Sequence, residues 1–399
     1  MSFPAFSHRN FRLFWTGNAI SLVGSLAQEA ARGWLVRTLT PDPFTIAAVA
    51  ACNSVPILFL TLYAGALADR VDKKRGLILT NALAMTLAVM LAVLTYTGAI
   101  TVIGVAVISL LVGVVSAFDI PIRQSMNVEM VGREDLPNAI ALNSTAFNGA
   151  RVAGPALGGF LIHAVGMAGC FALNALSFLA LIFNLRRMDL PPSPKSKGAS
   201  GLSEIREGFA FVRGHEVLWP TTILVAVCSF FALSFSSLLP VFAKDVLGSD
   251  ARGFSLLLSS SGAGALFSAG SLAVAGRMRH KGKRLLGGAL AFCGCVAGFA
   301  YAPNLIAACV WLFASGFCLL TFLTTANTLV QTLAPDELRG RVFSLYSLAL
   351  IGAGPLGALW TGAVAKFWGP RAGVALGAAI AALWAIGTYW KCRALWKEK

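Results

Sequence analysis

Long stretches without a charged side chain limit most strongly how this chain can fold. They run over 43–68, 76–118, 152–185, 217–243, 253–276, 285–335, 342–365 and 372–390. A helix that crosses a bilayer needs about 20 apolar residues, and most of these stretches supply them. Only 12% of the residues are charged, whereas a soluble domain carries about 25%. The sequence therefore predicts an integral membrane protein.

Two of the stretches are too long for one crossing. A Thr-Gly-Ala turn at 97–99 divides 76–118, and an Ala-Pro-Asn turn at 302–304 divides 285–335. Gly and Pro at such points indicate a break between helices. The stretch 152–185 belongs to two segments, 138–162 and 165–185, and one further apolar segment lies at 12–37. The pattern therefore predicts twelve membrane helices in an all-α membrane protein.

The positive charges are distributed unequally between alternate loops. Of the 32 Lys and Arg, 25 fall on one side, Arg32 and Arg151 lie inside predicted helices, and five fall on the other side: Arg37, Lys244, Arg252, Lys366 and Arg371. Cytoplasmic loops carry the excess of Lys and Arg, so both termini are expected in the cytoplasm. The net charge of +15 then reflects membrane topology, and we expect no nucleic-acid partner, because no basic-aromatic module accompanies it.

Composition and motifs exclude several kinds of chemistry. Seven of the eight cysteines lie in predicted helices, where packing is their expected role. The four histidines are scattered, so we expect no metal site and no cofactor. The sequence has no nucleophile elbow, no metalloprotease helix and no phosphate-binding loop, so we expect no enzyme activity and energy from an ion gradient.

The chain divides into two similar halves, 1–185 and 217–399. The segment 186–216 between them is a Pro, Ser and Lys-rich linker followed by an amphipathic stretch near 202–213, which is expected on the inner membrane surface. A Gly-Pro pair recurs at Gly154-Pro155 and at Gly354-Pro355, each in a helix rich in small residues. Two parallel repeats of six helices are the layout of one large transporter class.

Two motifs resemble those of the major facilitator superfamily, in its twelve-span antiporter type. The first is the loop Gly65-x-Leu-Ala-Asp-Arg-x-x-Lys-Lys74, in which Asp72 and Lys73 stand where the family usually has Gly and Arg. The second is the antiporter-motif helix Gly154-Pro155-x-x-Gly158-Gly159, which has Ala150 in place of a glycine. Together with the motif Asp-x-Pro-x-Arg at 119–123, these motif sequences are most similar to those of the branch that contains macrolide efflux pumps and enterobactin-type siderophore exporters. The resemblance implies two pseudo-symmetric six-helix bundles.

The same resemblance implies a cytoplasmic gate. Asp69 is expected to face the start of the eleventh helix near Leu338, where the helix dipole attracts an anion. Lys73 or Arg75 is expected to pair with Asp119 at the inner end of the fourth helix. The residues of this gate are Asp69, Arg70, Lys73, Arg75, Asp119 and Arg123. The alternative is that these charges form no gate and are solvated, and that they only determine the orientation of the chain in the membrane.

Charged residues inside the first and fifth helices are candidates for proton coupling. Glu29 is the only carboxylate predicted deep within a helix, and Arg32 lies three residues beyond it. Burial raises the pKa of a carboxylate and a nearby arginine lowers it, so Glu29 can exchange a proton as its surroundings change. The alternative is a permanent structural pair with Arg32 or Arg151. Arg151 either anchors Glu29 or binds an anionic group of a substrate.

The resemblance also implies that helices one, four, seven and ten line a central cavity. Aromatic and small polar side chains on the seventh and tenth suit an amphiphilic ligand, although each Phe alone is more often a packing residue. The cavity candidates are Gln28, Phe230, Phe231, Ser234, Phe235, Phe317, Thr321, Phe322, Thr325 and Asn327.

These observations favour a secondary active transporter of the bacterial cytoplasmic membrane. We expect a monomer, surrounded by lipids, that exports a small amphiphilic molecule (a drug or a siderophore) by proton antiport and alternating access. Two alternatives stay open. One is a lipid or lysolipid flippase of the same fold, and the other is a membrane scaffold or receptor that does not transport.

Overall fold

The computed structural model describes residues 4–68, 71–132, 134–189, 202–275, 280–335 and 338–392, and every regular element in these ranges is helical. A short η1 (Pro4–Ser7) precedes the first long helix. The helices of the N-terminal half are α1 (Arg9–Leu39), α2 (Pro43–Ala68), α3 (Lys73–Tyr96), α4 (Val102–Val131) and α5 (Leu136–Arg186). Those that follow are α6 (Leu202–Gly214), α7 (Leu218–Val227), α9 (Ala251–Ala275), α10 (Lys281–Ala300), α11 (Leu305–Leu333), α12 (Arg339–Trp368) and α13 (Pro370–Lys391).

The segment 218–246 is an irregular helix. After α7 it continues as η2 (Cys228–Ala232), a π-turn, and then as η3 (Leu233–Leu238), a 3-10 stretch. The short α8 (Leu239–Val241) and a second π-turn, η4 (Phe242–Val246), complete it. Such π-turns are frequent at functional sites.

The helices agree with the predicted membrane segments. In the described ranges, nine helical segments are long and apolar enough to cross a membrane. One of them, α5, contains two predicted segments joined at Gly166, whose φ of 75° reverses the chain and favours glycine. The long helices α1 and α9 are not among these nine. With these two added and α5 counted twice, the structure is consistent with twelve crossings.

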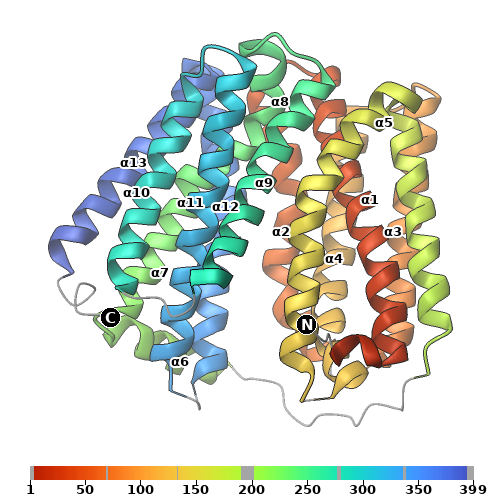
Figure 1. Cartoon of the computed structure of the whole chain (residues 1–399). Coiled ribbons are helices and arrows are strands. Elements are labelled where there is room, and N and C mark those ends of the chain that lie inside the picture. The colour runs from red at the N-terminus through yellow and green to blue at the C-terminus, as the bar shows by residue number, and fades with distance from the viewer. Residues whose placement is uncertain are drawn as a thin grey trace. The chain divides into compact units, whose positions relative to one another are not determined.

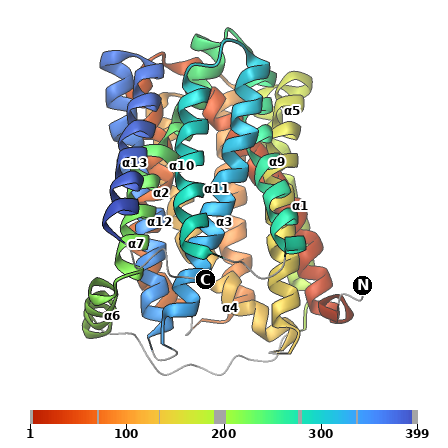
Figure 2. The ribbon, with the colours of Figure 1, turned by 60° about the vertical axis from the view of Figure 1, so that its left-hand side comes forward.

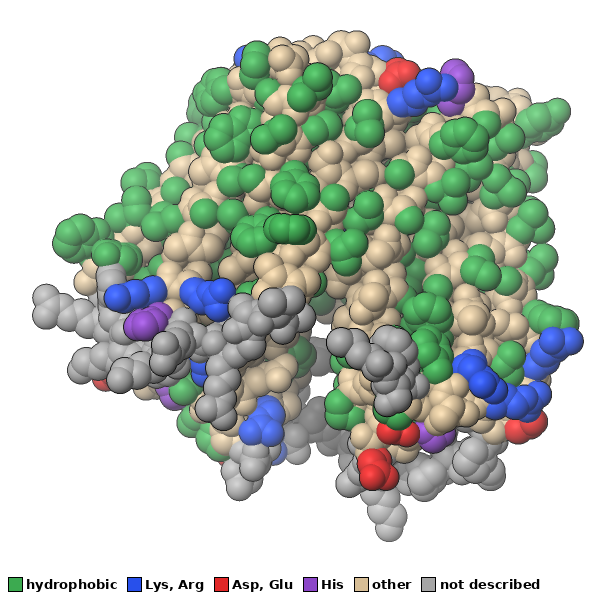
Figure 3. All heavy atoms as spheres, viewed as in Figure 1, with side chains coloured by type: hydrophobic (Ala, Val, Ile, Leu, Met, Phe, Trp, Pro, Cys, Tyr) green, Lys and Arg blue, Asp and Glu red, His purple; other side chains and the backbone are tan. Residues whose placement is uncertain are grey.

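Two compact units divide the chain. Unit 1 contains residues 1–39 and 52–199, and unit 2 contains 40–51 and 200–399. The helix α2 therefore begins in unit 2 and continues in unit 1. Figure 1 shows the long helices of each unit running side by side, and in Figure 3 Lys and Arg side chains gather toward the helix ends while hydrophobic side chains cover the faces between.

Unit 1 is built on a close contact between α1 and α5. A Cβ at Gly154 would lie 2.6 Å from Leu26 Cβ, and one at Gly158 would lie 2.9 Å from the Ala27 carbonyl oxygen. No side chain fits at these distances, so glycine allows the two backbones to approach. Gly154, Pro155, Gly158 and Gly159 are all buried. The antiporter-motif helix thus has a packing function in unit 1.

Unit 2 also contains a close contact between two helices at a glycine. A Cβ at Gly357 would lie 2.0 Å from the Phe230 carbonyl oxygen and 2.2 Å from Ser234 Oγ. The second Gly-Pro helix, α12, therefore lies directly against the irregular helix 218–246. Figure 2 shows α7 beside α12 at one side of this unit. The Gly-Pro pair that recurs in the sequence thus lies in each unit on a helix that packs closely against a neighbouring helix.

The predicted amphipathic stretch forms α6 in unit 2. Glu207 forms an ion pair with Arg341 near the start of α12, and the ring of Phe209 lies 5.8 Å from that of Trp219. Val212 is buried. These contacts fix α6 against the helices of unit 2, and its position on the inner membrane surface stays a prediction.

Candidate functional site

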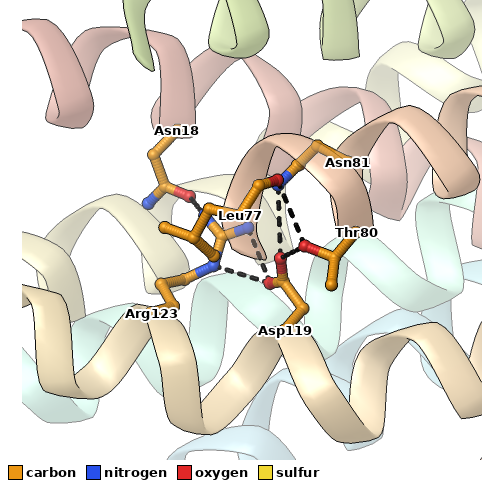
Figure 4. A network of polar contacts seen from close by, with 6 residues as sticks. All are labelled: Asn18, Leu77, Thr80, Asn81, Asp119 and Arg123. Atoms are coloured by element: carbon orange, nitrogen blue, oxygen red, sulfur yellow. Dashed lines mark hydrogen bonds and ion pairs between the residues drawn. The ribbon is translucent and has the colours of Figure 1, made fainter. Parts of the chain in front are cut away.

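A network of polar side chains connects α1, α3 and α4 inside unit 1 (Figure 4). Arg123 Nη2 lies 2.7 Å from Asp119 Oδ2, one helical turn away on α4. The other carboxylate oxygen accepts hydrogen bonds from Thr80 at 2.7 Å and Asn81 at 3.2 Å. Arg123 also donates to Asn18 Oδ1 on α1. Both charges are thus satisfied by side chains of the same unit.

The expected pairing of Lys73 or Arg75 with Asp119 is wrong in this structure. Lys73 Nζ instead contacts Glu129, and the Arg75 side chain lies 3.8 Å from Asp72. The physical reason is the length of α4, which continues to Val131 rather than ending near Asp119. Glu129 is ten residues beyond Asp119, or about 15 Å along the helix.

Of the other residues expected in the cytoplasmic gate, two are not described and Asp119 lies elsewhere along its helix than expected. Asp69 and Arg70 lie outside the described residues, so their part in the gate stays a prediction. Asp119 was expected at the end of the fourth helix, but it lies within α4 and is a second carboxylate inside a membrane helix. Its partners Thr80 and Asn81, and Asn18, which accepts a hydrogen bond from Arg123, were not identified from the sequence. Polar side chains within apolar helices are the signal that could have pointed to them.

The charges predicted within the first and fifth helices lie close together in unit 1. Glu29 interacts electrostatically with Arg32 on its own helix and with Arg151 on α5. Glu29 is exposed and the two arginines are half-buried. Among the described residues, no hydrogen bond joins Glu29 to either arginine. The close approach at Gly154, three residues after Arg151, brings this part of α5 to α1.

Gln28 packs within unit 1 rather than facing open space. Its side chain is 8% exposed and accepts a hydrogen bond of 2.9 Å from Asn174 Nδ2. Ser177 in turn donates to Asn174 Oδ1 at 2.9 Å. Gly24 is needed beside them, because a Cβ there would lie 2.6 Å from Asn174 Oδ1. Gln28 therefore belongs to the contact between α1 and the second arm of α5.

The cavity candidates on the irregular helix also pack inside unit 2. Ser234 donates to the Phe230 carbonyl oxygen, and Phe235 is buried with its ring 5.7 Å from Phe299. Phe230 and Phe231 are half-buried, and the Phe231 ring meets that of Trp360 edge-on at 5.0 Å. Trp360 was not among the residues predicted to line the cavity.

The candidates on α11 divide into buried and partly accessible side chains. Phe322 and Thr325 are fully buried. Thr321 is hydrogen-bonded to Ser268 of α9 at 2.9 Å. Phe317 and Asn327 are half-buried. A ligand-binding role for the partly accessible members stays a prediction.

Comparison with known proteins decides the family. Residues 1–396 match the model of the family described as "Transmembrane secretion effector". The chain belongs to this family of the major facilitator superfamily. Family members are transporters, so the expectation of a multi-pass membrane transporter rather than an enzyme is confirmed, as is the resemblance read from the motifs.

Characterised relatives of this transporter include two with named substrates or activities. The Staphyloferrin A transporter of Staphylococcus aureus is 26% identical over 263 residues, which are 64% of this chain and 64% of that protein. The chain thus matches less than two thirds of this relative. The multidrug efflux pump Tap of Mycolicibacterium fortuitum is 27% identical over 366 residues, or 89% of this chain and 87% of the pump.

Solved structures confirm the fold. The nucleoside transporter NupG has a TM-score of 0.74 at 15% identity, and the match covers 98% of this chain and 100% of NupG. A bacterial homologue of the human lysosomal transporter Spinster, solved inward-facing, has a TM-score of 0.67 at 15% identity over 97% of this chain and 96% of that one. At such identities these likenesses establish the major facilitator fold alone.

Proposed function

We propose that this transporter exports a small amphiphilic molecule, a drug or a siderophore, across the bacterial cytoplasmic membrane in exchange for protons. The names of two relatives support this substrate class, since one is a siderophore transporter and one a multidrug efflux pump. In this proposal both termini lie in the cytoplasm, in accord with the asymmetry of the Lys and Arg residues. The monomer works by alternating access within the lipid bilayer.

The observation that carries the coupling step is the position of Glu29 between two arginines. A carboxylate inside a membrane helix is expensive unless it is paired, and such residues often belong to proton pathways. Here Glu29 is exposed and interacts with Arg32 and Arg151 without a hydrogen bond to either. Protonation of Glu29 removes both attractions. A proton can therefore alter the α1–α5 region without a change in its backbone hydrogen bonds.

In the proposed exchange, these interactions control when Glu29 takes up and releases a proton. While Glu29 is charged, the two arginines hold it within unit 1. When a rearrangement withdraws an arginine, the carboxylate loses its stabilisation and takes up a proton from the side that is then accessible. Release of that proton on the other side resets the site. One charge that crosses 100 mV gains about 2.3 kcal/mol, which is enough to drive uphill export of a dilute solute.

The test of the proposal is a Glu29→Gln variant in proteoliposomes. With an imposed pH gradient, the wild-type protein is expected to accumulate a fluorescent amphiphilic drug such as ethidium against its gradient. Glu29→Gln should retain ligand exchange and lose accumulation, because glutamine cannot take up a proton. The matched control is Glu216→Gln, which removes an exposed carboxylate outside the membrane helices. Unchanged accumulation in Glu29→Gln contradicts the coupling role.

The same assay separates the proposal from its alternatives. Movement of a fluorescent lysolipid between leaflets, without movement of the drug, indicates a flippase. The absence of drug, siderophore and lysolipid movement in a folded protein indicates a scaffold or receptor. Either result contradicts the export proposal while leaving the family assignment intact.

A further inference from the structure

The helices α10 and α11 pack closely against each other in unit 2 (Figure 2). A Cβ at Gly288 would lie 3.3 Å from Phe322 Cα, and one at Gly298 would lie 2.6 Å from the Trp311 ring. These two contacts occur in opposite order along the two helices, so α10 and α11 are antiparallel. The glycines of α10 thus allow α11 to approach closely at both places.

One cysteine of each helix lies inside this contact. Cys295 is seven residues after the first of these glycines and three before the second, so it lies on the same face of α10. Cys318 is seven residues after Trp311 and four before Phe322, so it lies on the face of α11 that meets α10. Cys295 is level with the turn of α11 that precedes Cys318, and side chains tilt toward the N-terminus of their helix, so the two thiols point toward each other. They form a hydrogen bond with each other.

A second pair of thiols lies in the same unit. Cys228 of η2 and Cys293 of α10 also form a hydrogen bond with each other. The two pairs differ in access, because Cys228 and Cys293 are 2% and 1% exposed, whereas Cys318 is half-buried beside a Cys295 that is 9% exposed. A small reagent can therefore reach the Cys295–Cys318 pair through Cys318, and the Cys228–Cys293 pair provides a comparison within the same protein.

Two adjacent thiols can bind a soft metal ion or form a disulfide. Two thiolates around a cuprous ion leave a net negative charge, which is costly to bury between two apolar helices. A disulfide is neutral and satisfies both sulfur atoms without a further ligand. The apolar surroundings of α10 and α11 therefore favour disulfide chemistry at this pair.

We propose that Cys295 and Cys318 form an oxidisable thiol pair, which a peroxide converts into a disulfide between α10 and α11. The more accessible Cys318 reacts first, because its sulfur takes one oxygen atom from hydrogen peroxide to become a sulfenic acid, and one water leaves. The Cys295 thiol then attacks this sulfur, forms the S–S bond and releases a second water. In total the two thiols give up two protons and two electrons, which reduce the peroxide to water.

The disulfide is expected to slow transport because of the position of Cys318. Phe317 and Thr321, two of the residues predicted to line the cavity, are one and three residues away on α11. Thr321 is already hydrogen-bonded to Ser268 of α9. A covalent bond from Cys318 to α10 fixes α11 on a second side and limits its movement. This consequence rests on the proposed function, whereas formation of the disulfide does not.

The test is mass spectrometry of the purified full-length transporter after treatment with hydrogen peroxide. Remaining thiols are alkylated in denaturant, and the peptides are then mapped without reduction. The wild-type protein is expected to yield a cross-linked peptide that joins Cys295 to Cys318 and has lost the mass of two hydrogen atoms. Cys228 and Cys293 are expected to be alkylated, because the peroxide does not reach them.

Three variants identify the order of the two steps. Cys318→Ser is expected to leave Cys295 reduced, because the accessible thiol is gone. Cys295→Ser is expected to leave Cys318 as a sulfenic acid, which dimedone traps, because no second thiol can react with it. The matched control is Cys309→Ser, which removes another half-buried thiol of α11 and should leave the cross-linked peptide unchanged.

The proposal is overturned if no peptide joins the two cysteines, or if Cys228 and Cys293 become joined as readily. In proteoliposomes, peroxide is expected to slow ethidium movement by the wild-type protein severalfold, dithiothreitol should restore it, and Cys318→Ser should keep its own rate throughout. An unchanged rate in cross-linked wild-type protein contradicts the effect on transport. Because the peptide map needs no transport, a protein that does not move ethidium contradicts the export proposal and leaves the thiol pair to be decided by mass.

Discussion

An Asp119→Ala variant is expected to lower the melting temperature of the purified protein by about 5–10 °C. The substitution leaves Arg123 without its carboxylate and leaves the donors Thr80 and Asn81 without their shared acceptor. Breaking a fully buried pair costs about 3–5 kcal/mol. The side chains here are 17% and 25% exposed for Asp119 and Arg123, so we expect about 2–3 kcal/mol.

The control for this variant is an exposed ion pair in the same unit. Asp189 lies 3.2 Å from Arg9, with side chains 90% and 63% exposed. Asp189→Ala is expected to leave the melting temperature nearly unchanged, because exposed pairs contribute little. Equal melting temperatures for Asp119→Ala and the wild-type protein would show that the network in Figure 4 has no part in stability.

A Gly158→Val variant is expected to destabilise unit 1 by about 3 kcal/mol or more, beyond the usual range of 1–3 kcal/mol for overpacking. The added side chain meets the Ala27 carbonyl oxygen at 2.9 Å and Ala27 Cα at 3.1 Å, and backbone atoms cannot move aside as a flexible side chain can. The helices α1 and α5 must then separate, which also disturbs the hydrogen bond between Gln28 and Asn174. Yield of monodisperse protein and melting temperature measure the effect.

The matched control lies nine residues earlier on the same helix. A Cβ at Gly149 meets nothing within 4 Å. Valine has a better helix propensity than glycine, so Gly149→Val is expected to leave stability unchanged or slightly improved. Similar losses in both variants would show that the α1–α5 contact at Gly158 is not the reason for the loss of stability.

The fold could be predicted from the sequence because several independent features of the sequence indicate the same membrane helices. Charge-free stretches, turns and the distribution of Lys and Arg agreed on the crossings, and the structure differs mainly at helix ends. The end of α4 illustrates the remaining difficulty. Polar residues after Asp119 indicated a helix end near 118, yet the helix continues to Val131 because its polar side chains find partners on α1 and α3. Tertiary contacts of this kind are absent from a one-dimensional pattern.

The candidate site was less predictable for the same reason. The sequence identified the embedded charges Glu29, Arg32 and Arg151, because charge in an apolar helix is visible in any single chain. It could not separate packing residues from accessible ones on a helix such as 218–246, whose π and 3-10 turns change which side chains face the neighbouring helices. Phe235 on this helix is buried, and so is Phe322 on α11, although each lay on a helix expected to line the cavity.

Distances between spin labels at Tyr96 and Tyr301, recorded from mildly acidic to mildly alkaline pH, test the central claim most directly. The account predicts that the wild-type protein changes its distribution of distances with pH, and that Glu29→Gln has one distribution at every pH. A pH response retained in Glu29→Gln, or a wild-type distribution that does not change with pH, would contradict it.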